Sequence, residues 1–200
     1  MADQPRPYRM RRRAESQQQT RLRITESAVE LHGTVGPSRT SISAVAEHAG
    51  VRRSTVYRHF ADEAALFDAC SAHWSAANPP PDPLVWSSID DPGERLRIAL
   101  AELYAFYGQT AQMLENLLRD EHVPLVRERF GAFRGYLRVV QDALLTGASL
   151  RGSARRRTQA AIGHAIAFST WRSLVREQGL GAGEAAELMC ALVQAAPAAR

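Results

Sequence analysis

The chain has 200 residues, of which 45% are hydrophobic, and this share supports a packed core and excludes a chain that is disordered throughout. Its net charge of +4 is spread unevenly, because residues 1–60 contain 11 arginines and 5 acidic residues, whereas residues 61–200 contain 14 arginines and 16 acidic residues. This distribution predicts a polyanion-binding N-terminal part joined to a nearly neutral body.

No apolar run approaches the length of a membrane-spanning helix, and no apolar segment follows the basic N-terminus as a signal peptide would require. The two cysteines, Cys70 and Cys190, lie far apart and form no pairing or metal-binding pattern. We therefore expect a cytoplasmic protein without a metal or cofactor, in which both cysteines are buried as small apolar residues.

Residues 1–20 are polar and rich in arginine and show no apolar period, which predicts a flexible basic arm. A helix is expected from residue 21, where apolar residues recur at helical spacing, and it should stop at the sequence GTVGP, residues 33–37. The residues that set this spacing are Ile24, Ala28 and Leu31.

Two short helices and a third, longer one are expected next. Ser41 is a suitable N-cap for the first of them, and Gly50 should end it. The second should turn Val56 and Phe60 inward, and Asp62 can cap the third. The apolar positions of the first and third helices are Ile42, Val45, Ala46 and Ala49, and Leu66, Phe67 and Cys70.

Residues 77–93 contain five of the ten prolines and predict a linker. Beyond it, two apolar stripes predict long helices, namely Leu96, Leu100, Leu103 and Tyr107, and Val126, Phe130, Phe133, Leu137, Val140 and Leu144. A polar, basic loop is expected over residues 146–157. Helices over residues 158–177 and 184–196 are apolar on more than one side, which predicts that a second copy of the chain covers them.

No alternating apolar and polar stretch is long enough for a convincing strand, so the fold class is all-α. Between the two short helices, Ala46 is small enough for a close helix crossing, and Gly50 tolerates the positive φ of a three-residue turn. Val45, Val51 and Val56 should fill the angle between the helices. This pattern is typical of a helix-turn-helix.

The segment TSISAVAEHAGVRRSTVYRHFADEAALF, from Thr40 to Phe67, closely resembles the helix-turn-helix of TetR-type transcriptional regulators. Its matching elements are Thr40-Ser41-Ile42, Val45-Ala46, Ala49-Gly50-Val51, Thr55-Val56-Tyr57, His59-Phe60 and Leu66-Phe67. The preceding helix also fits, so that close similarity covers residues 21–70. The resemblance implies a DNA-binding domain (21–76) between the arm and the linker, and an effector-binding and dimerisation domain (94–200).

The outward face of the second short helix is expected to bind operator DNA. A recognition helix enters the major groove by its N-terminal end, which places Arg53, Ser54 and Thr55 nearest the base edges. Arg53 can make a bidentate contact to guanine. Arg11, Arg12 and Arg13 would reach along the backbone or into the minor groove. The other candidate DNA-binding residues are Arg52, Tyr57, Arg58 and His59, together with Thr40, Ser41 and Ser43 at the start of the preceding helix.

By resemblance, Tyr57 and His59 contact phosphates, and the C-terminal domain binds a small effector. The candidate pocket residues are Tyr104, Tyr107, Met113, Phe130, Phe133, Tyr136, His164, Phe168 and Trp171. Because these side chains are aromatic or apolar with few charges, the effector should be largely apolar. The expected protein is a homodimeric, ligand-responsive regulator, favoured as a repressor, that reads a pseudo-palindromic operator and pairs through its last two helices.

Two other functions stay open. A helical enzyme would need a site assembled by folding, because the sequence has no metalloprotease, phosphate-loop or nucleophile-elbow motif, and Asp120, Glu121 and His122 would point in different directions on a helix. A ligand-binding helical protein with weak or lost DNA binding is supported by Glu63, which stands where TetR-type regulators usually carry a phosphate-holding lysine.

Overall fold

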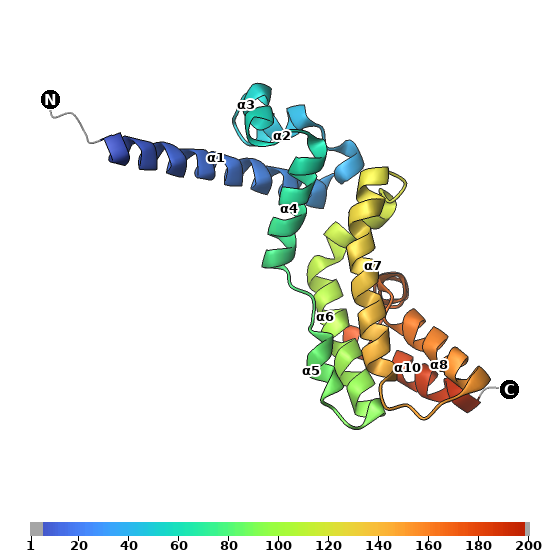
Figure 1. The fold of residues 1–200 in the computed structure, drawn as a ribbon. Coiled ribbons are helices and arrows are strands. Elements are labelled where there is room, and N and C mark those ends of the chain that lie inside the picture. The colour runs from blue at the N-terminus through green and yellow to red at the C-terminus, as the bar shows by residue number, and fades with distance from the viewer. Residues whose placement is uncertain (1–5, 199–200) are drawn as a thin grey trace. The chain divides into compact units, whose positions relative to one another are not determined.

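The computed structural model describes residues 6–198, with side chains described for residues 10–197. Within this range every regular element is helical, which confirms the all-α fold (Figure 1). The elements are α1 (Arg6–Thr34), the 3-10 turn η1 (Pro37–Arg39), α2 (Ile42–His48), α3 (Arg53–His59), α4 (Glu63–Ala77), α5 (Pro83–Ser87), α6 (Pro92–Arg119), α7 (Pro124–Leu145), α8 (Gly152–Ala165), α9 (Phe168–Trp171), the π-helical turn η2 (Arg172–Glu177), α10 (Ala182–Ala195) and the 3-10 turn η3 (Ala196–Ala198).

The chain forms two compact units. The first, which we call the head, holds the chain up to Asn78 together with Glu115–Arg129, and the second, the body, holds Pro79–Leu114 and the residues from Phe130 onward. This division differs from the expected one, which assigned residues 115–129 to the C-terminal domain. Polar pairing joins this segment to the head: the Asn116 amide donates to the carbonyls of His32 and Gly33 at 2.9 and 2.8 Å.

Residues 6–20, expected as part of a flexible arm, form the first turns of α1, while residues 1–5 of that expected arm lie outside the described residues. Residues 11–19 are exposed, so burial does not hold this segment in place. Arginine, glutamine, glutamate and alanine are good helix formers, and Arg11 pairs with Glu15 one turn later at 3.0 Å. Local propensity and an i,i+4 ion pair therefore explain the helix.

The expected proline-rich linker, residues 77–93, contains a packed helix. Trp86 of α5 is fully buried, and its Nε1 donates to Glu102 of α6 at 2.8 Å. Asp82 accepts a hydrogen bond from the Leu84 amide and caps α5, whose first residue is Pro83. Prolines are favoured in the first turn of a helix, so the same residues that predicted a linker begin α5.

Residues 146–177 were expected to form a loop followed by one continuous helix, and the structure places the helices of this region at other positions. Residues 152–157, expected in the loop, begin α8, and the helix expected over 158–177 is interrupted at Ile166 and Ala167 before α9 begins. Three hydroxyls donate hydrogen bonds to backbone carbonyls at this interruption. The hydroxyl of Tyr104 donates to Ala165 at 2.9 Å, that of Tyr107 to Ile166 at 2.5 Å, and that of Thr170 to His164 at 2.6 Å.

Tyr107→Phe is expected to destabilise the body by about 1–3 kcal/mol, because it leaves the buried Ile166 carbonyl without a donor. Native-state hydrogen exchange of the α8 and α9 amides measures this loss. Tyr136→Phe is the matched control, with a smaller expected loss because its acceptor, the carbonyl of Pro81, is only partly buried. Equal protection of α8 and α9 in Tyr107→Phe and the wild type would contradict the role given to this hydroxyl.

Candidate nucleic-acid interface

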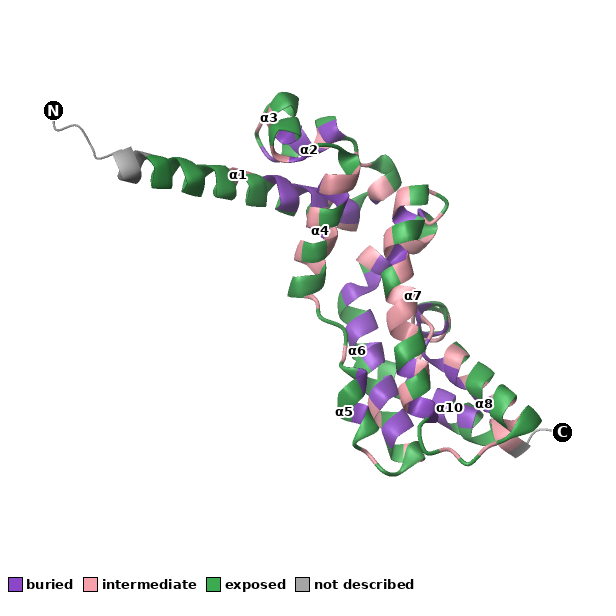
Figure 2. Ribbon diagram, in the orientation of Figure 1, coloured by how far each residue is buried: buried purple, intermediate pink, exposed green. Residues whose placement is uncertain are grey.

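The head is built on a core to which α1, α2, α3 and α4 all contribute (Figure 2). Its fully buried side chains include Ile24 and Ala28 of α1 and Val56 of α3, and Phe60 is 2% exposed. Because α3 turns Val56 inward, its opposite face is left to solvent. The expected core positions of the helix-turn-helix are confirmed, with Val51 partly buried.

The turn between α2 and α3 has the expected geometry. Gly50 adopts φ 62°, a left-handed conformation that suits glycine, and the Val51 amide donates to the Ala46 carbonyl at 2.9 Å. Ser41 caps α2 by accepting from the Ala44 amide at 3.1 Å, and Asp62 caps α4 by accepting from the Ala65 amide at 2.8 Å. Both predicted caps are therefore confirmed.

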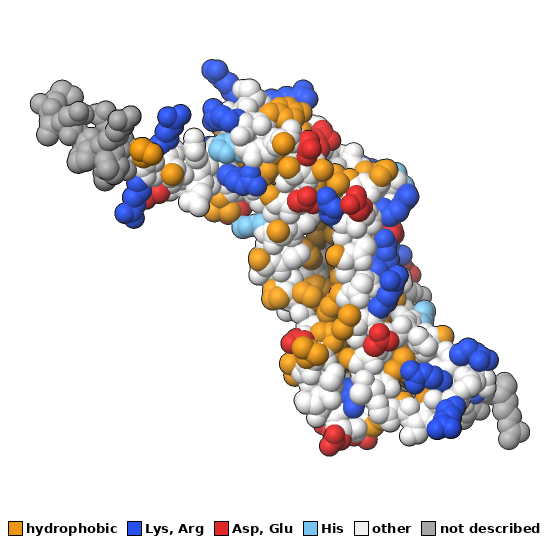
Figure 3. All heavy atoms as spheres, viewed as in Figure 1, with side chains coloured by type: hydrophobic (Ala, Val, Ile, Leu, Met, Phe, Trp, Pro, Cys, Tyr) orange, Lys and Arg blue, Asp and Glu red, His pale blue; other side chains and the backbone are white. Residues whose placement is uncertain are grey.

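The predicted DNA-binding residues of α3 and its N-cap lie mostly on its outward face. Arg52, Arg53, Ser54, Tyr57 and Arg58 are exposed, and Thr55 is half-buried. Figure 3 shows arginine side chains standing out from the surface around α3. At the start of α2, Ser41 and Ser43 are exposed, whereas Thr40 is half-buried and donates to the Gly36 carbonyl at 2.8 Å. Arg11, Arg12 and Arg13 are exposed on α1.

Arg53 is held by Tyr57 one turn later on α3. Its Nη2 donates to the Tyr57 hydroxyl at 3.2 Å, and its guanidinium carbon lies 5.5 Å from the centre of the Tyr57 ring. Hydrogen bonding to Tyr57 raises the pKa of Arg53 further above its usual value. Tyr57, predicted as a phosphate contact, is thus also the partner of the predicted base-reading residue.

Tyr57→Phe is expected to weaken DNA binding about two- to tenfold, because it removes the hydrogen bond to Arg53 but keeps the ring. A double-mutant cycle with Arg53→Ala separates the two roles that Tyr57 can have. Coupling of about two- to tenfold in the dissociation constant is expected if Tyr57 positions Arg53. Additive losses would show that Tyr57 acts through phosphate alone.

His59 lies differently from the other α3 candidates. It is half-buried, and its Nε2 is buried without a hydrogen-bond partner among the described residues. Burial, and then the charges of Arg58 and Arg21, lower the pKa of His59. The Nε2 atom of His59 is thus enclosed in this conformation, and the predicted phosphate contact of His59 stays a prediction.

Arg21 supports α3 in a way that sequence reasoning missed. Its guanidinium donates to the His59 carbonyl at the end of α3 and lies 4.1 Å from the centre of the Phe60 ring. A positive charge at the C-terminus of a helix is favourable, and the contact joins α1 to the C-terminal end of α3. The only signal for it in the sequence was an arginine at the start of an apolar period.

The head also contains two polar contacts that were not predicted from the sequence, one between His32 and Cys70 and one between Ser38 and Asp120. The His32 Nδ1 lies 3.4 Å from the Cys70 Sγ, and burial lowers the pKa of His32 to about 4 and raises the pKa of Cys70 to about 12. Asp120 accepts from the Ser38 amide at 2.9 Å. Burial opposes ionisation of Asp120, but hydrogen bonds from Arg119 and Ser38 outweigh it and hold the pKa of this carboxyl below its usual value.

The expected effector residues in the body form an aromatic cluster. Tyr107 contacts Phe168 with ring centres 5.4 Å apart, Phe168 stacks on Trp171 at 5.3 Å, and Phe133 lies 5.9 Å from Tyr136 and 5.4 Å from Phe130. Tyr104 is buried, and Met113 is half-buried. The hydroxyl of Tyr136 donates to the Pro81 carbonyl at 2.8 Å.

His164, which stays a predicted pocket residue, is exposed, whereas Phe168 and Trp171 are buried. A continuous helix over residues 158–177 would place these three residues on one face, but the interruption at Ile166 and Ala167 changes that spacing. The aromatic cluster also contains a buried polar atom without a hydrogen-bond partner among the described residues, Trp171 Nε1. Trp171 is 2% exposed, and Arg176 lies over its ring at 5.6 Å.

In the described part of the chain, no helix combines the length and apolar character needed to cross a membrane. No group of three or more histidine, cysteine, aspartate or glutamate side chains in that part is arranged to hold a metal ion.

Residues 24–70 match the family model described as bacterial regulatory proteins, tetR family. No curated protein shows significant sequence similarity to the chain. Among solved structures, NalD, the secondary repressor of the MexAB-OprM multidrug efflux pump in Pseudomonas aeruginosa, is 22% identical with a TM-score of 0.60, over 88% of this chain and 95% of NalD.

Two further structures are similar in fold. A TetR-family transcriptional regulator from Bordetella parapertussis is 20% identical with a TM-score of 0.57, over 86% of this chain and 93% of that one. A mutant of HlyIIR, with one segment replaced by a linker, is 17% identical with a TM-score of 0.62, over 88% of this chain and 95% of that one. At these identities the likeness shows the fold, and the match to the tetR family model covers residues 24–70.

Proposed function

We propose, from the membership of residues 24–70 in the tetR family of bacterial regulatory proteins, that this transcriptional regulator is a homodimeric repressor released from its operator by a small, largely apolar effector. The observation that carries the DNA-binding part is the arrangement of α3. Its inward residues Val56 and Phe60 are fixed in the core, while Arg52, Arg53 and Arg58 face solvent.

The proposed DNA contacts follow from this arrangement. Arg53, Ser54 and Thr55 would enter the major groove at the N-terminal end of α3, with Arg53 reading guanine. Tyr57, Arg58 and the start of α2 would hold phosphates and so fix the position of α3 on the duplex. The exposed arginines of the α1 extension, Arg11 to Arg13, would add contacts to flanking phosphates.

The proposed effector site is the aromatic cluster of the body. Its apolar rings suit a largely apolar ligand. Trp171 Nε1 is a buried donor without a partner in the described structure, and such a group is costly to leave unsatisfied. We therefore propose that the effector carries a hydrogen-bond acceptor for Trp171. The π-helical turn η2 follows Trp171 directly, and π-helical turns are frequent at functional sites.

The proposed dimer pairs through the C-terminal helices. Leu188 and Leu192, one turn apart on α10, are 42% and 53% exposed, whereas Met189 and Val193 are buried. A leucine pair on the exposed face of a helix whose other face is buried fits the same face of a second copy. A two-fold dimer would present two α3 helices, which requires a pseudo-palindromic operator.

The experiment that tests DNA binding is a mobility shift of the full chain on the DNA upstream of its own gene, at rising salt. Binding dominated by phosphate contacts loses about a thousandfold or more in affinity between about 50 and 200 mM salt. That steep loss, with retention of a specific complex over competitor DNA, is the expected result. A complex insensitive to salt, or no complex at low salt, would contradict the proposal.

A further inference from the structure

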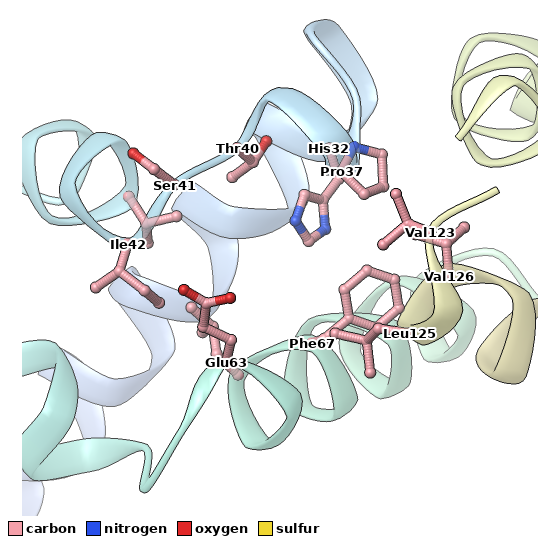
Figure 4. A pocket seen from close by; sticks show the side chains of 12 residues that line it. His32, Pro37, Thr40, Ser41, Ile42, Glu63, Phe67, Val123, Leu125 and Val126 are labelled. Atoms are coloured by element: carbon pink, nitrogen blue, oxygen red, sulfur yellow. The ribbon is translucent and has the colours of Figure 1, made fainter. Parts of the chain in front are cut away.

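The head contains an open pocket of about 110 Å³, and the function proposed above makes no use of it (Figure 4). Its lining residues come from α1, η1, α2, α4 and the start of α7 with the residues just before it, and none comes from α3. The walls are mostly apolar. They include Ile42 and Val45 of α2, Leu66 and Phe67 of α4, and Leu125 and Val126 of α7.

Glu63 lies at the rim of this pocket. It is exposed at the start of α4, and Figure 4 shows its carboxylate directed toward the space that His32 and Phe67 also border. Within the described residues, no hydrogen bond or ion pair engages this carboxylate. Its charge acts on Arg53 of α3, whose hydrogen bond goes to Tyr57.

The described residues that line the pocket contribute one negative charge, that of Glu63, and no positive charge near pH 7. His32 is the other titratable lining residue that the structure describes, and burial keeps it neutral near pH 7 by lowering its pKa to about 4. The hydroxyl of Thr40 is engaged by the Gly36 carbonyl, and that of Ser41 caps α2. The pocket therefore combines apolar walls with one negative charge that no cationic side chain described in the structure contacts directly.

We propose that this pocket binds a short-chain alkylamine in its ammonium form, with the ammonium group at the Glu63 carboxylate and the alkyl chain between Ile42, Phe67 and Val126. Its size sets the chain length, since a cavity of about 150 Å³ holds benzene and one of this volume holds about four or five heavy atoms. A carboxylate at the edge of an apolar wall favours an amphipathic cation over a metal ion, which would need several oxygen ligands.

The site would also change DNA binding, and this part rests on the proposed function. Thr40 and Ser41, which line the pocket, belong to the proposed phosphate contacts at the start of α2. A bound ammonium group neutralises the negative charge of Glu63 beside them and so removes repulsion of the DNA backbone. The amine should therefore strengthen DNA binding, the opposite of the effect proposed for the effector of the body.

The binding test is a titration of the ¹⁵N-labelled full chain with n-butylammonium chloride, followed by amide NMR, with sodium chloride at equal concentration as the reference. Saturable shifts centred on Thr40, Phe67 and Val126 are expected. Glu63→Gln should weaken binding at least tenfold, and the neutral isostere n-butanol should bind the wild type at least tenfold more weakly. Glu47→Gln, which removes an exposed carboxylate of α2 outside the pocket, should leave binding unchanged.

Equal affinity for the amine and the alcohol, an unchanged affinity in Glu63→Gln, shifts centred on the body, or no saturable binding would each overturn the site. In the mobility shift, n-butylammonium should tighten the complex about threefold or more in the wild type and not in Glu63→Gln. Amine binding without any effect on a normal DNA complex would overturn the coupling alone. Amine binding by a chain that forms no DNA complex would overturn the proposed function and leave the site standing.

Discussion

Arg53→Ala is expected to lower operator affinity about ten- to a hundredfold for each half-site and to abolish the preference for guanine at one position of each half-site. The reason is geometric: Arg53 is the first residue of α3, is exposed, and is held by Tyr57 in a defined orientation before DNA arrives. Preorganisation of this kind reduces the entropy cost of the contact. The measurement is a competition assay with duplexes that differ at a single base pair.

Two control variants separate base reading from loss of charge. Arg58→Ala also removes a charge from α3, but it should weaken every duplex alike. Arg138→Ala removes an exposed arginine of the body and should change neither affinity nor preference. If Arg53→Ala weakened all duplexes equally, as Arg58→Ala does, Arg53 would be a phosphate contact and the assignment of the base-reading end of α3 would be wrong.

Ile24→Ala is expected to destabilise the head by about 2–5 kcal/mol, because it opens a cavity beneath the recognition helix. Ile24 is fully buried in the core that also holds Val56 and Phe60, so the loss falls on the elements that position α3. Native-state hydrogen exchange reads the head and the body separately and is the suitable measurement.

The control for Ile24→Ala lies on the same helix. Leu22 is 46% exposed, and Leu22→Ala should change the protection of the head amides little. The amides of α2, α3 and α4 should exchange faster in Ile24→Ala, whereas those of α8 and α10 should not. Equal acceleration in both units would mean that they unfold together and that the head is not a cooperative unit.

The sequence was most informative where structure is set by neighbouring residues. Ser41, Gly50 and Asp62 act within three residues of their own positions, as a cap, a turn and a second cap, and all three were predicted. The core face of each short helix followed from its spacing. Local signals of this kind need no knowledge of the rest of the chain.

Features that depend on distant partners were not predicted. The break after α8 relies on Tyr104 and Tyr107, which lie about sixty residues earlier in the chain. Residues 115–129 join the head because Asn116 bonds to the end of α1. The helical structure of residues 6–20 was not predicted because an apolar period was required, whereas this segment forms a helix through local propensity and an i,i+4 ion pair.

The structure adds a second interpretation of Glu63, the acidic residue that departs from the pattern of TetR-type regulators. In the sequence it is an acidic residue where TetR-type regulators usually carry a lysine, which suggests weaker DNA binding. In the structure its carboxylate borders a pocket, so its charge has a proposed ligand. Neutralisation of the Glu63 charge by the proposed amine would increase DNA affinity, so the amine concentration would set that affinity.

The most direct test of the central claim is selection of duplexes from a random-sequence pool by the full-length protein at moderate salt. The account predicts enrichment of an inverted repeat whose half-site centres lie about one helical turn, or a multiple of it, apart, with a guanine that loses its enrichment when Arg53→Ala is used. Recovery of unenriched sequences by a folded, dimeric protein would contradict it.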